Sequence, residues 1–229
     1  MKKTVVITGA TDGIGYELAL LLKEDYQLAL CGRSEEKMAA LVEKLEGAQV
    51  YQECFDITDD EKRDAFCKNV LEHFKTVDIL VNNAGANVKK DRVTDIDLSQ
   101  LRYMLELNCV SALGMIQGLY PAMKVKKQGL IVNVLSSCCL FNNPMTGAYS
   151  ASKDAMEGIS KILLKAVKGE NIGVCNVYPG GVDTSFRPNP NEKYLKPKTV
   201  AKMIKSCMEN EEGCVHEIVV RPFVEDNIC

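Results

Sequence analysis

The chain has 229 residues, of which 46% are hydrophobic and 26% are charged, and its formal net charge is −3. This length fits one α/β domain or two small ones, with enough apolar residues for a sizeable core. The nearly balanced charge, without long runs of one sign, argues against nucleic acid or an anionic membrane as the main partner. Because no apolar run approaches the ~18 residues that span a bilayer, we expect a cytoplasmic protein.

Ten cysteines are present, but their surroundings in the sequence are those of free thiols. Several of them, including Cys31, Cys109 and Cys175, stand in apolar segments, where a thiol acts as a small hydrophobe. The sequence has neither Cys-x-x-Cys nor His-x-x-x-His, so it predicts no metal site. A reducing compartment without disulfides is the expected setting.

The first motif follows a short apolar run at residues 3–8, which is typical of a strand buried on both faces. Residues 8–15 then read T-G-A-T-D-G-I-G, and an apolar helical pattern begins at Ile14. The order strand, glycine-rich turn and helix favours a dinucleotide-binding unit. Its glycines allow the backbone to approach a pyrophosphate, and the helix offers free N–H groups to the phosphates. The alternative is a tight turn that binds nothing.

A second strand at residues 27–31 ends at Gly32-Arg33. In proteins that bind NAD, an Asp or Glu usually ends this strand and binds the ribose 2′-hydroxyl. Gly32 stands where that acidic residue is expected, and the guanidinium of Arg33 suits a 2′-phosphate. The sequence therefore favours NADPH over NADH, with a solvated loop charge as the alternative for Arg33.

Strands and helices alternate along the rest of the chain. We expect strands at 50–55, 78–81, 130–135, 173–178 and 217–220, helices at 35–46, 59–74, 98–120 and 198–210, and a mobile loop at 185–198. This pattern predicts a doubly wound parallel sheet of about seven strands flanked by helices, in one Rossmann-fold α/β domain that covers residues 1–229. In such sheets, ligands bind at the carboxyl ends of the strands.

Tyr149 and Lys153 are four residues apart in a predicted helix, so their side chains share one face. A nearby ammonium favours phenolate and lowers the tyrosine pKa, which equips the phenol for proton transfer. Chance pairs with this spacing are common, so the site needs further support. Asn108 lies in an apolar stretch and must form hydrogen bonds, either in a site or with its own helix. Ser136 follows the fifth strand.

Together these motifs resemble the short-chain dehydrogenase/reductase family over residues 4–221. The chain matches the family's T-G-x-x-x-G-x-G turn at 8–15, its N-N-A-G motif at 82–85, its Y-x-x-x-K pair at 149–153 and its P-G stretch at 179–184. The catalytic set that the resemblance implies is Asn108, Ser136, Tyr149 and Lys153. Ser136 stands thirteen residues before Tyr149, as the family pattern requires, and Ser137 is the alternative.

The resemblance also implies a binding site for NADP(H), with NAD(H) as a possible substitute. The residues that it assigns to the cofactor are Gly9, Thr11, Asp12, Gly13, Ile14, Gly15, Arg33, Asp56, Ile57, Asn83, Ala84, Gly85, Tyr149, Lys153, Pro179, Gly180, Val182 and Thr184. Residues 138–148 and 185–198 are expected to shape the substrate pocket. Leu140, Phe141, Met145 and Phe186 indicate that its walls are largely apolar, and Cys138-Cys139 are expected to line a wall unless they have a redox role.

The implied activity is hydride transfer between NADP(H) and a small-molecule carbonyl or secondary alcohol, of the 3-oxoacyl or hydroxysteroid type. In it Ser136 holds the carbonyl oxygen, Tyr149 exchanges the proton, and Lys153 tunes Tyr149 and binds the nicotinamide ribose. Asn108 steadies a water that links Lys153 to solvent. The alternatives are a catalytically silent NADP(H)-binding sensor or scaffold and a sugar-nucleotide epimerase or dehydratase.

A homo-oligomer is also implied. The chain ends in V-E-D-N-I-C instead of the family's Gly-Asp-Gly tail, which favours a homodimer through residues 100–120 and 150–168 over a homotetramer.

Overall fold

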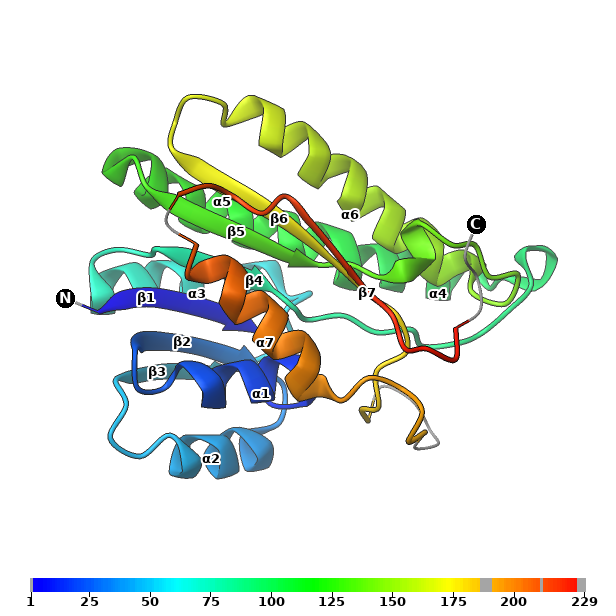
Figure 1. The fold of residues 1–229 in the computed structure, drawn as a ribbon, viewed down its shortest axis with the longest axis horizontal. Coiled ribbons are helices and arrows are strands. Elements are labelled where there is room, and N and C mark those ends of the chain that lie inside the picture. Colours follow the sequence, from blue (N-terminus) through cyan, green and yellow to red (C-terminus); the bar gives the residue numbers. More distant parts are fainter. Residues whose placement is uncertain (1, 186–190, 211, 226–229) are drawn as a thin grey trace.

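Seven strands rich in valine, leucine and isoleucine form the centre of the molecule in the computed structural model, which describes residues 2–185, 191–210 and 212–225. They are β1 (Lys3–Thr8), β2 (Tyr26–Gly32), β3 (Val50–Cys54), β4 (Ile79–Asn82), β5 (Gly129–Val134), β6 (Ile172–Pro179) and β7 (Glu217–Val220). All neighbouring strands pair in parallel, in the order β3-β2-β1-β4-β5-β6-β7 (Figure 1). The doubly wound Rossmann-type sheet predicted from the sequence is confirmed.

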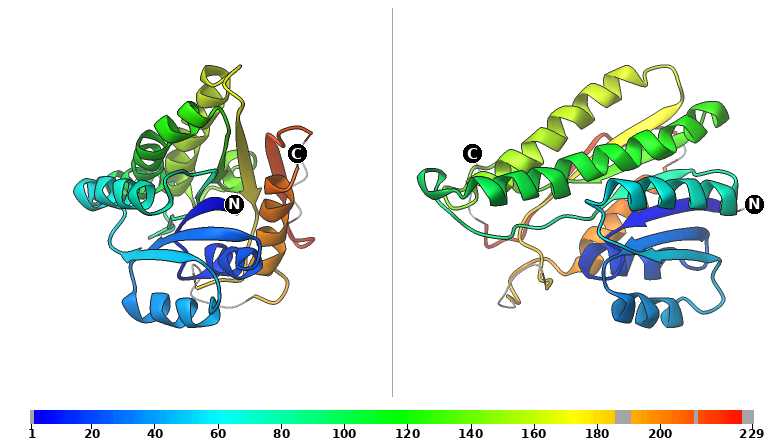
Figure 2. Two further views of the ribbon diagram at one scale, coloured as in Figure 1. Left: turned by 90° about the vertical axis from the view of Figure 1, so that its left-hand side faces the viewer. Right: turned by 180° about the vertical axis from the view of Figure 1, so that it is seen from behind.

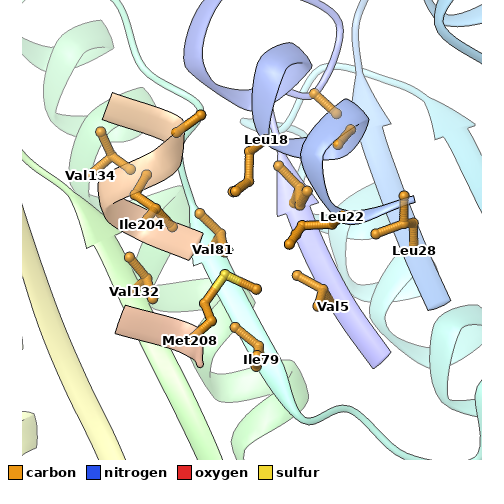
Figure 3. Packing of buried hydrophobic residues seen from close by; sticks show 14 of the residues in the cluster. Val5, Leu18, Leu22, Leu28, Ile79, Val81, Val132, Val134, Ile204 and Met208 are labelled. Atoms are coloured by element: carbon orange, nitrogen blue, oxygen red, sulfur yellow. The ribbon is translucent and has the colours of Figure 1, made fainter. Parts of the chain in front are cut away.

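Helices cover both faces of this sheet, as the end-on view in Figure 2 shows. They are α1 (Gly13–Leu22), α2 (Glu35–Lys44), α3 (Asp60–Phe74), α4 (Leu98–Leu105), α5 (Ser111–Lys126), α6 (Gly147–Ala166) and α7 (Pro197–Met208). On one face, Leu18 and Leu22 of α1 meet Ile204 and Met208 of α7 over the apolar side chains of the central strands (Figure 3). On the other face, α3, α5 and α6 bury a second cluster around Phe66.

The strand order reverses between β1 and β4, where connections leave toward opposite sides of the sheet. Crevices at the carboxyl ends of strands beside such a reversal are where doubly wound folds bind ligands. The glycine-rich turn follows β1, and the segment Asn83–Gly85 follows β4. The fold therefore places these two sequence motifs next to each other.

The helix predicted at 98–120 differs from the observed one in two respects. The observed helical segment extends to Lys126, and a π-helical turn at Glu106–Val110 separates α4 from α5. The backbone N–H of Ser111 bonds the carbonyl of Glu106, and its hydroxyl donates to the carbonyl of Leu107 at 2.7 Å. One side chain thereby satisfies a carbonyl that the widened turn leaves without its usual partner. Asn108 lies inside this turn.

The predicted loop at 185–198 is partly structured where the structure describes it. Leu195 forms a parallel bridge with Val182, its N–H donates to the carbonyl of Gly181 at 2.9 Å, and α7 begins at Pro197. Phe186, which we expected in the pocket wall, lies outside the described residues, as does Met1, where the predicted domain begins.

The nine cysteines within the described residues are free thiols, as the sequence predicted. Six of them are buried, and five of these, including Cys31 and Cys175, lie in the apolar layers.

Across the described ranges, no helix combines the length and apolar character needed to cross a bilayer.

Candidate active site

The glycine-rich turn between β1 and α1 leaves room for a ligand at the start of α1. Gly9 and Gly13 have φ of 65° and 54°, in the left-handed region that glycine adopts without strain. A Cβ on Gly15 would lie 2.5 Å from the carbonyl oxygen of Gly9, so only glycine fits there. Asp12 precedes α1 but makes no side-chain cap, whereas Ser34 caps α2. The uncapped N–H groups of α1 are suited to a diphosphate.

The N-N-A-G motif is bonded to this turn. The Asn83 amide donates to the carbonyls of Thr8 and Gly9 at 2.9 and 3.1 Å. The Thr8 hydroxyl accepts the N–H groups of Asn83 and Ala84, both at 3.0 Å. These bonds occupy the Asn83 side chain with protein partners. They fix the backbone of Ala84 and Gly85 next to the glycine-rich turn. Sequence reasoning missed the bonds that the Thr8 hydroxyl accepts.

The residues expected at the adenosine end lie at the carboxyl ends of β2 and β3. Arg33 is exposed directly after β2, and Ile57 is buried. Asp56 accepts the N–H and hydroxyl of Thr58 at 3.0 and 2.8 Å, which folds the exit from β3. Asp12 of the turn pairs with Lys37 in the first turn of α2. The pKa of Asp12 is lowered overall, because the bonds from Lys37 and Ser185 outweigh the effect of burial.

Tyr149 and Lys153 lie one turn apart near the start of α6. Lys153 is only 5% exposed, and its ammonium donates to the carbonyl of Val134 at 2.8 Å. Burial lowers the pKa of Lys153 to about 8, against an opposing effect of nearby thiols. A lysine is seldom buried without a carboxylate partner, so its position beside a half-buried tyrosine is typical of a chemical site.

Asn108 connects the π-helical turn to both halves of this centre. Its Oδ1 accepts the N–H of Ala86 at 2.9 Å, and its Nδ2 donates to the Ala86 carbonyl and the Ser152 hydroxyl, both at 2.9 Å. Ser152 in turn donates to the carbonyl of Tyr149 at 2.7 Å. A Cβ on Gly85 would lie 2.7 Å from Asn108 Oδ1 and 3.1 Å from Lys153 Nζ. Asn108, Lys153 and the N-N-A-G segment are therefore in contact.

Ser136 and the two cysteines lie directly after β5. Ser136 is half-buried in extended backbone, and its hydroxyl accepts the N–H of Cys138 at 3.2 Å. The Cys138 thiol is buried among polar side chains, and its bonds from Cys139, Ser136 and Ser150 lower its pKa. Cys138 thus packs against Ser136, and its place in a wall of the substrate pocket stays a prediction. The bond between the two thiols, burial and the nearby Asp154 raise the pKa of Cys139.

The segment after β6 crosses the sheet edge toward the glycine-rich turn. Val182 is buried, and a Cβ on Gly13 would lie 3.0 Å from Thr184 Cγ2. The Ser185 hydroxyl donates to Asp12 at 2.7 Å. Pro179 and Gly180 lie at the carboxyl end of β6, beside β5 and Ser136. The fold therefore gathers most predicted site residues along one edge of the sheet, with Arg33, Asp56 and Ile57 at its far end.

A family model described as short chain dehydrogenase matches residues 3–195. The chain belongs to the short-chain dehydrogenase family. This short-chain dehydrogenase is 30% identical to a protein of Staphylococcus aureus (strain MW2) that is named as an uncharacterized oxidoreductase. The match covers 96% of the present chain and 97% of the relative.

Solved structures show the same fold. An alcohol dehydrogenase from the archaeon Thermococcus sibiricus, complexed with 5-hydroxy-NADP, has a TM-score of 0.89 and 27% identity over 97% of both chains. ElxO with NADP bound has a TM-score of 0.85 and 26% identity over 96% of this chain and 98% of its own. The family model spans every predicted site residue of this short-chain dehydrogenase, since these lie between Gly9 and Thr184.

Sequence reasoning missed a ladder of buried polar side chains beneath the site. Asn82, Asn133 and Asn176 occupy paired positions on β4, β5 and β6. Asn82 donates to Asn133 at 2.9 Å, Asn133 to Ser160 at 2.8 Å, and Ser160 to Asn176 at 2.6 Å. The recurrence of asparagine near three strand ends was the available signal. The ladder links the strands that end at the site to α6, which carries Tyr149.

Proposed function

We propose that this protein is an NADPH-dependent carbonyl reductase that acts on a ketone or aldehyde. The observation that carries the proposal is the buried Lys153, one helical turn after Tyr149, at the sheet edge where Gly85 and Asn108 meet. A buried cation beside a phenol supports a proton donor, because the charge favours the phenolate that remains after donation. NADPH would supply the hydride, and the chain would supply position and protons.

Each residue of the proposed centre has a separate part in the reaction. The Ser136 hydroxyl would bond the carbonyl oxygen of the substrate and hold it beside Tyr149. Tyr149 would donate its proton to that oxygen, or accept one when an alcohol is oxidised. Lys153 would stabilise the phenolate and bond ribose hydroxyls. Asn108 would position Lys153 and Ser152, since both of its amide hydrogens already have protein partners. A water relay from Lys153 to solvent stays a prediction.

The residues at the start of α1 fit a dinucleotide. The uncapped N–H groups and the close packing of Gly9 and Gly15 support a diphosphate position at this turn. Arg33, exposed after β2, supports the 2′-phosphate of NADPH, and the NADP ligands of the two structural relatives agree with it. A fluorescence titration should show NADPH bound more tightly than NADH. Tighter binding of NADH would remove the NADPH assignment.

The test of the catalytic proposal is Tyr149→Phe. Because the substitution removes the proton donor and leaves the ring, turnover should fall by roughly 10²–10⁴ while NADPH affinity is retained. Tyr120→Phe is the matched control, since it removes a hydroxyl that bonds Glu170 on the other side of the molecule. Undiminished turnover in Tyr149→Phe would refute the assignment.

The substrate class is to be found with an NADPH-oxidation screen over 3-oxoacyl thioesters, steroids, quinones and small diketones. Leu140 and Met145 are partly exposed after Ser136 and support a largely apolar pocket wall. Tight NADPH binding without turnover on any of these substrates would favour the silent sensor. The presence of Ser136 and Tyr149 together with Lys153 argues against that alternative, because a protein that only binds NADP(H) needs no proton donor.

A further inference from the structure

The five residues after β7, 221–225, form a folded segment that contains an ion pair between Arg221 and Glu225. Arg221 Nε donates to Glu225 Oε2 at 3.2 Å, and the N–H of Glu225 donates to the carbonyl of Pro222 at 3.0 Å. The two charged side chains are only 15% and 22% exposed. An ion pair so largely removed from water is more strongly coupled than a surface pair and is sensitive to the loss of either partner.

The second carboxylate oxygen of Glu225 reaches the segment after β6. Oε1 accepts the N–H of Gly181 at 2.6 Å, a charge-assisted bond to backbone. The fit is close, because a Cβ on Gly180 would collide with Oε2 and one on Gly181 would lie 2.9 Å from Oε1. In Figure 1 the red segment after β7 runs beside the yellow segment after β6. Glu225 thus holds the P-G stretch expected at the nicotinamide.

Arg221 extends this connection to the loop after Ser136. Its guanidinium carbon lies 4.1 Å from the ring centroid of Phe141, within the range of a cation–π contact. Phe141 is itself fixed by its N–H, which donates to the carbonyl of Ser137 at 2.8 Å. Phe141 belongs to the segment expected to form a wall of the substrate pocket.

We propose that Arg221 and Glu225 form a latch that positions the nicotinamide segment and the substrate wall relative to each other, an inference that rests on the carbonyl-reductase proposal. One carboxylate bridges Gly181 to Arg221, and Arg221 bridges that carboxylate to Phe141. Neither residue lies in a motif that the sequence matched. They are positioning residues, since the contacts that define them are with protein segments and not with the reacting atoms.

The first test is Glu225→Ala. Loss of the charge-assisted bond to Gly181 should raise the KM for the carbonyl substrate and the Kd for NADPH by about tenfold or more. The kcat should change by less than about threefold, because Ser136, Tyr149 and Lys153 keep their own contacts. Binding of 2′,5′-ADP should be unchanged, since that probe lacks the nicotinamide half. Loss of fold alone would weaken NADPH and 2′,5′-ADP equally.

Glu225→Gln keeps an acceptor for the Gly181 N–H and loses the charge that holds Arg221. It should recover most of the NADPH affinity and leave KM raised, as should Arg221→Met, which keeps Glu225 on Gly181. Glu209→Ala is the matched control, because Glu209 pairs with Lys205 at the same i, i+4 spacing at the far end of α7.

Wild-type KM and NADPH affinity in Glu225→Ala would overturn the latch, and so would equal losses for NADPH and 2′,5′-ADP. Should Glu225→Ala not fold, Glu225→Gln and Arg221→Met decide the question: wild-type KM in both overturns the latch. Failure of the carbonyl-reductase proposal is seen separately, as undiminished turnover in Tyr149→Phe.

Discussion

The proposed nucleotide cradle and the proposed catalytic centre of this protein lie at one sheet edge but are built in different ways. The cradle, residues 8–15 with 83–85, uses backbone groups and glycines, and the Thr8 hydroxyl and the Asn83 amide bond its two parts together. The catalytic centre draws side chains from the π-helical turn, the loop after β5 and α6. It contains a buried cation, Lys153, for which burial is unfavourable.

This difference predicts that the two regions fail differently under substitution. In the cradle, space is limiting, so an added methyl group should disrupt binding and folding together. In the catalytic centre, a charged group is buried at a cost in stability, so removing that group should lower activity and can raise the free energy of unfolding. Active sites that retain unfavourable groups for function show this trade-off.

The largest effect is expected from Gly15→Ala. A methyl group placed 2.5 Å from the Gly9 carbonyl and 2.6 Å from the Asn83 amide must displace the turn. NADPH affinity should fall by more than about 100-fold, and the free energy of unfolding by roughly 1–3 kcal/mol, in the range of overpacked sites. Both are measured by fluorescence titration and urea unfolding.

Gly158→Ala is the control for that change, because nothing lies within 4 Å of the added methyl group in the middle of α6. It should stabilise by about 0.5–1 kcal/mol through helix propensity. Destabilisation of both variants by the same amount would contradict the steric account of the cradle.

The opposite sign is expected from Lys153→Met. A fall of the lysine pKa to about 8 on folding corresponds to an unfavourable term on the order of 3 kcal/mol while the group stays protonated. Methionine removes this term and the bond to Val134, so apo protein at pH 7 should be more stable than wild type by about 1 kcal/mol or more, with turnover lost.

The difference in stability between Lys153→Met and wild type should depend on pH in a defined direction. Between about pH 8 and the pKa of an unfolded lysine near 10.4, the unfolded chain binds more protons than the folded one. The free energy of unfolding of the wild type therefore rises with pH across this window relative to that of Lys153→Met, and the difference between them should become smaller. Urea unfolding of both proteins at pH 7 and pH 10 measures it, and a gap that widens with pH would contradict the buried-cation account.

The smallest effects on stability are expected from removing two hydroxyls, that of Thr8 in the cradle and that of Ser152 in the catalytic centre. Thr8→Val leaves the N–H groups of Asn83 and Ala84 without their acceptor, and Ser152→Ala removes one partner of Asn108. Each should lower the free energy of unfolding by about 0.5–1.5 kcal/mol, the net contribution of a typical hydrogen bond. Thr8→Val should mainly weaken NADPH binding, and Ser152→Ala should mainly lower kcat. Identical kinetic profiles would show that the two regions are not separable.

Much of the fold was predictable because its patterns are local. Buried parallel strands appear as continuous apolar runs, so all seven strands were predicted within one residue of their observed ends. The widened turn at Asn108 was not predicted, since no apolar period in the sequence indicates a π-helical turn. The Val182–Leu195 bridge was also missed, because it pairs single residues on either side of a proline-rich stretch and leaves no periodic pattern.

The sequence by itself determined the doubly wound sheet, the glycine-rich turn and the pairing of Tyr149 with Lys153 on one helix. Each of these depends on residues close in the chain, where spacing alone fixes which groups meet. The tertiary structure decided the burial of Lys153, the amide bonds of Asn108 to Ala86, and the reach of Glu225 to Gly181. These contacts join residues 22 and 44 positions apart or depend on how the core closes around a charge, and no periodic pattern encodes them.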